Sequence, residues 1–203
     1  MEDNEVVLNS RSPKVQQVLA RASAIAQGCG LREVLLKGFG EVLVDQVLDA
    51  ICVQYLGYMV NEERIPNNQV EEKLSLELVD EYAQFFDMAV RFYSDDNPLC
   101  KHPVSLDGLD FGPEYAQDMD IIKFVIQLIN KHGVSDRVYA AVNGDTDGQL
   151  QRVLTYAFGY IQDCAEEDGS LSVLNVLLNQ HLITGILDGL NGEEEQKGDL
   201  ANG

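Results

Sequence analysis

Apolar residues recur at intervals of three and four along most of this chain, which is the spacing of one face of an α-helix. The first such stripe begins after Ser12-Pro13, a hydroxyl N-cap followed by proline at the first helical position, and stops at Gly28. A second, short stripe covers residues 31–37 and ends at Gly38-Phe39-Gly40. These patterns predict two helices separated by glycine turns, with a break before residue 41.

Two longer apolar segments follow in the first half of the chain. Residues 41–60 are apolar around most of the helical circumference, which predicts a helix at the centre of the fold, and only Glu41, Asp45 and Asp49 make a polar stripe on it. A loop is expected around Pro66. Residues 69–94 then predict one long helix that carries most of the aromatic residues of the chain.

The second half shows the same kind of pattern. It predicts a helix over residues 114–132, a short helix capped by Ser135, and a helix opened by a capping box of Thr146 and Gln149. A last apolar helix is expected from Ser170 to about residue 187. Since no run of four or more residues alternates between apolar and polar, the sequence predicts an all-α fold, with residues 6–8 as the one short strand candidate.

A repeated phrase suggests an internal duplication. Leu56-Gly57-Tyr58-Met59 reappears as Phe158-Gly159-Tyr160-Ile161, 102 positions later, in similar surroundings. We therefore expect two related helical units of about four helices each, packed as one globular body. The expected organisation is a flexible N-terminus (1–11), unit 1 (12–94), a long loop or linker (95–112), unit 2 (113–189) and a disordered acidic tail (190–203).

The charge balance restricts the partners. The 203 residues include 14 basic and 34 acidic side chains, which gives a net charge of −20. A negative field repels phosphate backbones and anionic lipid, so neither nucleic-acid binding nor membrane docking is expected, and a basic protein partner is favoured. The simpler interpretation is that this charge only keeps the protein soluble.

The setting inferred from the sequence is cytoplasmic. The four cysteines, at positions 29, 52, 100 and 164, contain no Cys-x-x-Cys pair and are typical of reduced thiols. The acidic N-terminus does not resemble a signal peptide. Membrane insertion of the apolar segment 42–60 is not expected because acidic residues interrupt it.

Two segments resemble parts of metal sites. Asn143-x-Asp145-x-Asp147-Gly148 matches the first half of a calcium loop, but its twelfth position is Leu154 instead of a bidentate glutamate, so a helix N-terminal turn is the preferred interpretation. Cys100-Lys101-His102 offers two zinc-ligand types without a second close pair. The sequence contains no recognised nucleotide-binding or hydrolase motif. We therefore predict no metal, no cofactor and no catalytic residue.

The candidate partner-binding residues are Glu41, Asp45 and Asp49, which are either a solvated face or a contact for Lys and Arg, together with Gly57, Tyr58, Gly159 and Tyr160. Glycine inside a helix costs about 1 kcal/mol relative to alanine and usually permits close approach of another group. Each Gly-Tyr step therefore marks either a helix crossing within its unit, the preferred interpretation, or a groove for a partner helix.

One short segment resembles a known family. Cys52-x-x-Tyr55-Leu56-Gly57-Tyr58, followed by an acidic turn at Glu62-Glu63, is similar to a segment of the small acidic chaperone-adaptors of type IVB secretion systems. The resemblance implies a role in secretion and virulence. It also implies binding to a tail or helix of a coupling ATPase, or delivery of effectors to it, without enzymatic activity. It assigns no binding residue.

The preferred hypothesis is a non-enzymatic adaptor or chaperone that holds a basic or amphipathic helix, or an extended segment, of a partner protein. Two alternatives remain open. One is an enzyme or a small-ligand or metal-binding protein with a pocket between the two units, using His102 or Asp145 and Asp147. The other is an acidic inhibitor that mimics the charge of a nucleic acid.

Overall fold

Helices are the regular elements of this structure. A computed structural model of the protein describes residues 12–94, 100–108, 112–113, 116, 119–166, 169 and 171–183, and these residues contain no strand. The all-α prediction is confirmed. The chain divides into two compact units, Met1–Asp95 and Asp96–Gly203. The strand candidate at 6–8, the predicted N-terminus 1–11 and the predicted tail 190–203 lie outside the described residues.

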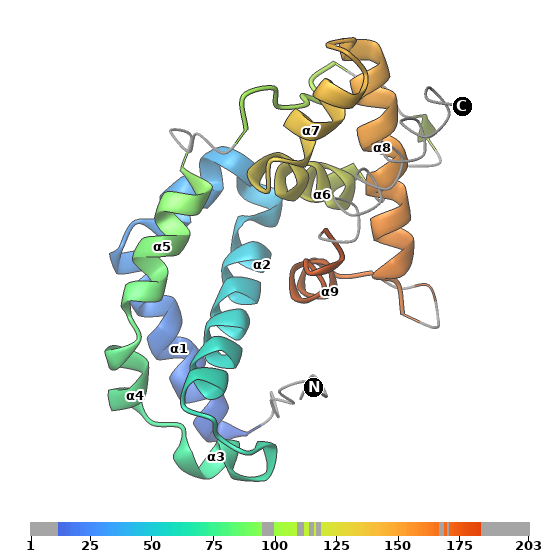
Figure 1. The fold of residues 1–203 in the computed structure, drawn as a ribbon. Helices are drawn as coiled ribbons and strands as arrows, with labels where there is room; N and C mark the ends of the chain where they lie inside the picture. The colour runs from blue at the N-terminus through green and yellow to red at the C-terminus, as the bar shows by residue number, and fades with distance from the viewer. Residues whose placement is uncertain are drawn as a thin grey trace, which may run out of the picture. The chain divides into compact units, whose positions relative to one another are not determined.

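Unit 1 is built around one long helix. Helix α1 (Pro13–Gly28) and helix α5 (Gln84–Tyr93) both pack along α2 (Leu31–Glu62), as Figure 1 shows. The connection from α2 to α5 consists of a 3₁₀ turn, η1 (Asn67–Gln69), and two short helices, α3 (Val70–Lys73) and α4 (Leu76–Glu81), of which α4 contacts α1. The buried face of α2 is almost entirely apolar, as its sequence pattern predicts.

The predicted break before residue 41 is present inside α2. Gly40 has a φ of 75° and a ψ of 175°, which no other residue type adopts without strain, and the helix resumes immediately after it. The two helices predicted over 31–37 and 41–60 are therefore the two arms of α2.

The prediction of one long helix over residues 69–94 is wrong. The chain is extended at Leu74, with a ψ of 133°, and Ser75 then caps α4 by accepting a hydrogen bond from the N–H of Leu78 at 3.1 Å. A second break, at Tyr82 and Ala83, separates α4 from α5. The serine hydroxyl offers the backbone an alternative to a continuous helix, and the apolar spacing persists across the break and so does not reveal it.

Unit 2 contains four helices within the described residues: α6 (Met119–Lys131), α7 (Val134–Ala141), α8 (Thr146–Asp163) and α9 (Val173–Leu178). Helix α6 packs against α7, α8 and α9, and α7 packs against α8. Part of the predicted linker 95–112, residues 100–108, is described and belongs to this unit.

Three predicted helix starts in unit 2 are displaced. Helix α7 begins after Gly133, which is left-handed with a φ of 72°, and not at Ser135. Asp145 and not Thr146 caps α8. Ser172 and not Ser170 caps α9, and its hydroxyl oxygen accepts a hydrogen bond from the N–H of Asn175. In each case another residue close to the expected cap offers the better cap or left-handed conformation.

The two units repeat one local arrangement. In each, a left-handed glycine, Gly30 or Gly133, joins the first two helical segments. In each, a buried tyrosine of the following long helix donates a hydrogen bond to a carbonyl of a short, serine-capped helix. Tyr55 binds the carbonyl oxygen of Val79 in α4, and Tyr160 binds that of Val176 in α9 at 2.6 Å.

This bond corrects the alignment of the two halves. Val79 and Val176 each lie four residues after the capping serine, so Tyr55 is the counterpart of Tyr160, 105 positions away. The repeated Gly-Tyr phrase pairs Tyr160 with Tyr58 instead, which is nearly one helical turn further on. The last carbonyls of a helix lack partners within the helix, and the tyrosine hydroxyl satisfies one of them.

We expect Tyr160→Phe to destabilise the protein by about 1–2 kcal/mol, because the mutation leaves the buried carbonyl of Val176 without its donor. Urea denaturation followed by circular dichroism measures this change. Tyr58→Phe is the matched control, since Tyr58 is only half-buried and makes ring contacts that phenylalanine keeps. An equal loss of stability in both variants would contradict the anchoring role of the hydroxyl.

Candidate functional site

The acidic stripe lies on the surface of α2. Glu41, Asp45 and Asp49 are all exposed. Asp45 is already paired, since its Oδ1 lies 2.9 Å from Nε of Arg32. Partial burial, and then the charge of Asp45, raise the pKa of Asp49. Glu41 and Asp49 are the two acids of the stripe that remain for an external cation.

The two glycines of the repeated phrase are not sites of close helix crossing. A Cβ atom added at Gly57 or Gly159 would meet no atom within 4 Å among the described residues, although both positions are half-buried. The preferred interpretation of these glycines, a helix crossing within each unit, is therefore wrong. No described part of the chain fills the space above either glycine.

The two tyrosines of the phrase have different environments. Tyr58 is half-buried, with its ring edge-on to Tyr82 at 6.0 Å and tilted against Phe85 at 5.5 Å. Tyr160 is 2 % exposed and its hydroxyl is bound to Val176. Tyr160 thus belongs to the interior of unit 2, and only Tyr58 offers surface to a partner.

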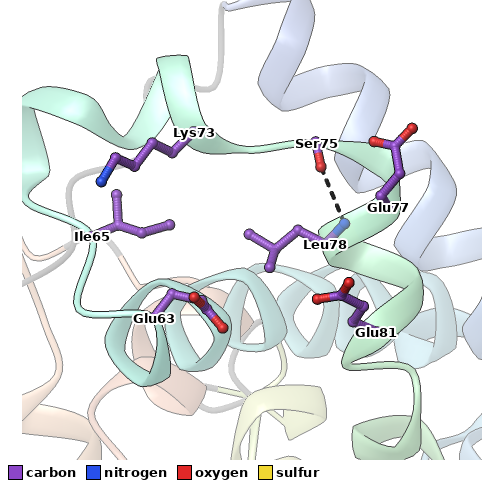
Figure 2. A pocket seen from close by; sticks show the side chains of 7 residues that line it. All are labelled: Glu63, Ile65, Lys73, Ser75, Glu77, Leu78 and Glu81. Atoms are coloured by element: carbon purple, nitrogen blue, oxygen red, sulfur yellow. Dashed lines mark hydrogen bonds between the residues drawn. The ribbon is translucent and has the colours of Figure 1, made fainter.

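The structure adds a pocket in unit 1 that the sequence did not predict. Its volume is about 360 Å³, and it lies between the end of α2, the following segment and α4 (Figure 2). The lining residues come from three stretches that a break in the chain brings together: Glu63, Ile65, Lys73, Ser75, Glu77, Leu78 and Glu81.

Two local features shape this pocket. Arg64 is left-handed, with a φ of 51°, and reverses the chain at the end of α2. The cap at Ser75 starts α4 in a new direction. Glu81 follows Glu77 by four residues and Leu78 by three, so these three side chains share the helix face that lines the pocket. Of these two features, only the cap at Ser75 belongs to the break in the helix predicted over residues 69–94.

The pocket combines apolar side chains with an acidic rim. Ile65 and Leu78 supply the apolar surface, and Figure 2 shows Lys73 across the pocket from Glu77 and Glu81. Neither of these two glutamates has an ion-pair partner among the described residues. Residues 61–81 contain seven acidic and two basic side chains.

Glu63 connects the pocket to the aromatic cluster. Its Oε1 accepts a hydrogen bond from the hydroxyl of Tyr82 at 2.6 Å, and this bond, with partial burial, raises the pKa of Tyr82 to about 12. Tyr82 in turn lies against Tyr58. The pocket thus borders the ring pair of Tyr82 and Tyr58.

Cys100-Lys101-His102 is anchored to α7. The carboxylate of Asp136 accepts the main-chain N–H groups of Lys101, at 2.8 Å, and of His102, at 2.6 Å, and lies 3.1 Å from Nδ1 of His102. Although partial burial acts in the opposite direction, these hydrogen bonds lower the pKa of Asp136. Burial, and then the charge of Asp136, raise the pKa of Cys100, which disfavours a reactive thiolate.

The calcium-loop resemblance coincides with a helix start. Asp145 accepts the N–H of Asp147 at 3.1 Å as the N-cap of α8, and Asn143 is left-handed. Within the described residues, no three His, Cys, Asp or Glu side chains are grouped so that they could bind a metal ion. The same part of the chain includes no helix long and apolar enough to cross a membrane.

Comparison with known proteins yields no relative: no protein-family model, curated protein or solved structure matches the chain. The resemblance to the type IVB adaptors therefore stays a prediction. Function is inferred below from the pocket and its surroundings.

We expect Gly57→Ala to stabilise unit 1 by about 0.5–1 kcal/mol, since alanine is the better helix former and the site has room for a methyl group. Gly40→Ala is the control. It also has room, but its left-handed φ should make the substitution destabilising by about 1–3 kcal/mol. Thermal and urea denaturation distinguish the two, and a destabilised Gly57→Ala would show that the surface above Gly57 is occupied.

The carboxylate of Asp136 should contribute to acid sensitivity. Because its pKa is lower in the folded than in the unfolded protein, its contribution to stability is present above the unfolded pKa of about 4 and is lost as the pH falls through the folded value. Urea denaturation at pH 7, 5, 4 and 3 should show a smaller acid loss of unfolding free energy for Asp136→Asn than for the wild type. Parallel curves would contradict this assignment.

Proposed function

We propose that the chain is a non-enzymatic adaptor or chaperone that holds a segment of a partner protein in the pocket of unit 1. The observation that carries the proposal is the pocket itself, in which Glu63, Glu77 and Glu81 surround the apolar side chains of Ile65 and Leu78. A volume of about 360 Å³ accommodates one or two side chains of a polypeptide and not a large cofactor.

The chemistry of the lining favours an arginine or lysine side chain. Such side chains lay an aliphatic stem on apolar surface while the charged end reaches polar groups. Ile65 and Leu78 would contact the stem, and the carboxylates of Glu77 and Glu81 would accept hydrogen bonds from the cation. Arginine is the better match, because its guanidinium presents five donors in a fixed geometry.

Several features favour binding over catalysis. Ser75 is the only hydroxyl side chain of the lining, and it is engaged as the helix cap. Glu63, Glu77 and Glu81 are exposed, so these carboxylates stay hydrated and suit reversible ion pairing. The net charge of −20 would accelerate the approach of a basic segment.

The partner segment would extend beyond the pocket. Tyr82 and Tyr58 follow Glu63 in one series of contacts, which suits a segment with an apolar or aromatic residue next to the basic one. Glu41 and Asp49, earlier on the same arm of α2, would be further contacts for basic residues. A role in secretion, as the resemblance to the type IVB adaptors implies, belongs to this proposal.

The test compares two fluorescein-labelled peptides that differ in one group, Ala-Leu-Ala-Arg-Leu-Ala and the same peptide with citrulline for arginine. Citrulline keeps the shape and removes the charge. Fluorescence anisotropy should show tighter binding of the arginine peptide to the wild type, and Glu77→Gln/Glu81→Gln should weaken it about 10-fold, as expected for the loss of about 1–2 kcal/mol from two ion pairs.

Glu71→Gln/Glu72→Gln is the matched control, since it removes the same charge from neighbouring exposed positions that do not line the pocket. This variant should bind the arginine peptide nearly as the wild type does. If both double variants weaken binding equally, overall charge and not the pocket recognises the peptide. If the citrulline peptide binds as well as the arginine peptide, the proposal is wrong.

A further inference from the structure

Residues 101–104 lie across a set of polar side chains of unit 2, which together are termed the groove. Side chains from three helices contact this segment: Asn130 of α6, Asp136 of α7 and Gln149 of α8. Their hydrogen bonds go to the main chain of the segment. The groove is separate from the pocket of unit 1 in every residue that lines it.

The side-chain amide of Asn130 bonds both the N–H and the C=O of Val104, as the backbone of a neighbouring β-strand would. Its Nδ2 donates to the carbonyl oxygen of Val104 at 2.9 Å, and its Oδ1 accepts the N–H of Val104 at 3.1 Å. Gln149 donates to the carbonyl oxygen of His102 at 2.9 Å. Together with the two N–H groups that Asp136 accepts, three side chains satisfy five main-chain groups of the segment.

The groove is preorganised. Asn130 is 7 % exposed, Gln149 5 % and Ser135 fully buried. The hydroxyl of Ser135 donates to Oδ1 of Asn130 at 2.6 Å, and the carbonyl of Ser135 accepts from Gln149 at 2.9 Å, which fixes the orientation of both amides. Buried amides without partners are costly, so these side chains require a main chain in the groove.

The segment in the groove is recognised with little regard to its side chains. Any residue other than proline offers the same N–H and C=O groups. The groove bonds the N–H groups of residues 101, 102 and 104, and proline, which has no N–H, stands at position 103. Two side-chain features remain: the ring of His102 stacks on Tyr139 at 3.9 Å, and Val104 is 8 % exposed. The groove therefore selects a ring two residues before an aliphatic side chain.

We propose that this groove is a second peptide-binding site, occupied by the chain's own residues 101–104, which an extended segment of a partner protein with the pattern ring-x-aliphatic displaces. Lys101, His102 and Pro103 are exposed, whereas Asn130, Ser135 and Gln149 beneath them are buried. The segment is thus the outermost layer of unit 2, and its departure leaves the contacts among α6, α7 and α8 in place. The proposal does not depend on the pocket of unit 1.

Native-state hydrogen exchange of the wild type is the first test. The amides of Lys101, His102 and Val104 are bonded only to groove side chains, so they should exchange through a local opening at least 100-fold more often than the core amides of α6 and α8. Exchange of both sets at the same rate would mean that the segment leaves only when unit 2 unfolds, and this would overturn the proposal.

The second test adds the segment in trans. The attached segment competes at a millimolar effective concentration, so a free peptide should bind the wild type weakly and a variant with a weakened attached segment more tightly. A fluorescein-labelled peptide of residues 100–107, with Cys100→Ser, should bind His102→Ala/Val104→Gly at least 10-fold more tightly than the wild type. Adding Asn130→Ala to that variant should remove the binding. Absence of binding to the double variant with unchanged helical circular dichroism, or binding that Asn130→Ala leaves intact, would overturn the proposal.

Discussion

The position of the pocket depends on the attachment of α4, in which the hydroxyl bond of Tyr55 is the buried element. Helix α4 is too short to be stable alone, and it is attached to α2 by the hydrogen bond from buried Tyr55 to the carbonyl of Val79 and by the burial of Val79. Tyr55 also packs against Phe86 of α5, with ring centroids 4.6 Å apart. The same tyrosine thus joins α2, α4 and α5. The position of Glu77 and Glu81 follows from this attachment, and so does the pocket.

The excess of acid is divided between structural and free carboxylates. Asp80 is bound to Arg21, Asp45 to Arg32 and Asp136 to main-chain N–H groups. These acids orient helices and a loop. Glu77 and Glu81 have no such partners among the described residues, and they are gathered over apolar side chains. These two carboxylates thus stay hydrated beside apolar surface.

The helical pattern predicted the fold class and the break at Gly40, because both are local consequences of residue type. It did not predict the break at Leu74 and Ser75, since apolar spacing continues through it; Ser75, three residues before Leu78, was the available signal. The pocket was missed because three stretches form it. The sequence aligns the two halves on the Gly-Tyr phrase. The equivalence of Tyr55 and Tyr160 depends instead on their hydrogen bonds to Val79 and Val176, which lie 24 and 16 residues further along the chain.

The shared tyrosine anchor has an evolutionary consequence. Counted from the capping serines, Glu77 and Glu81 of α4 correspond to Leu174 and Leu178 of α9, which are 37 % and 45 % exposed. The anchored valine is the same in both helices, Val79 in α4 and Val176 in α9, while these two outward positions are carboxylates in one helix and hydrocarbon in the other. The residues that anchor the short helix and the residues that it presents to solvent are therefore different, so the outward positions can change between the two units without loss of the anchor.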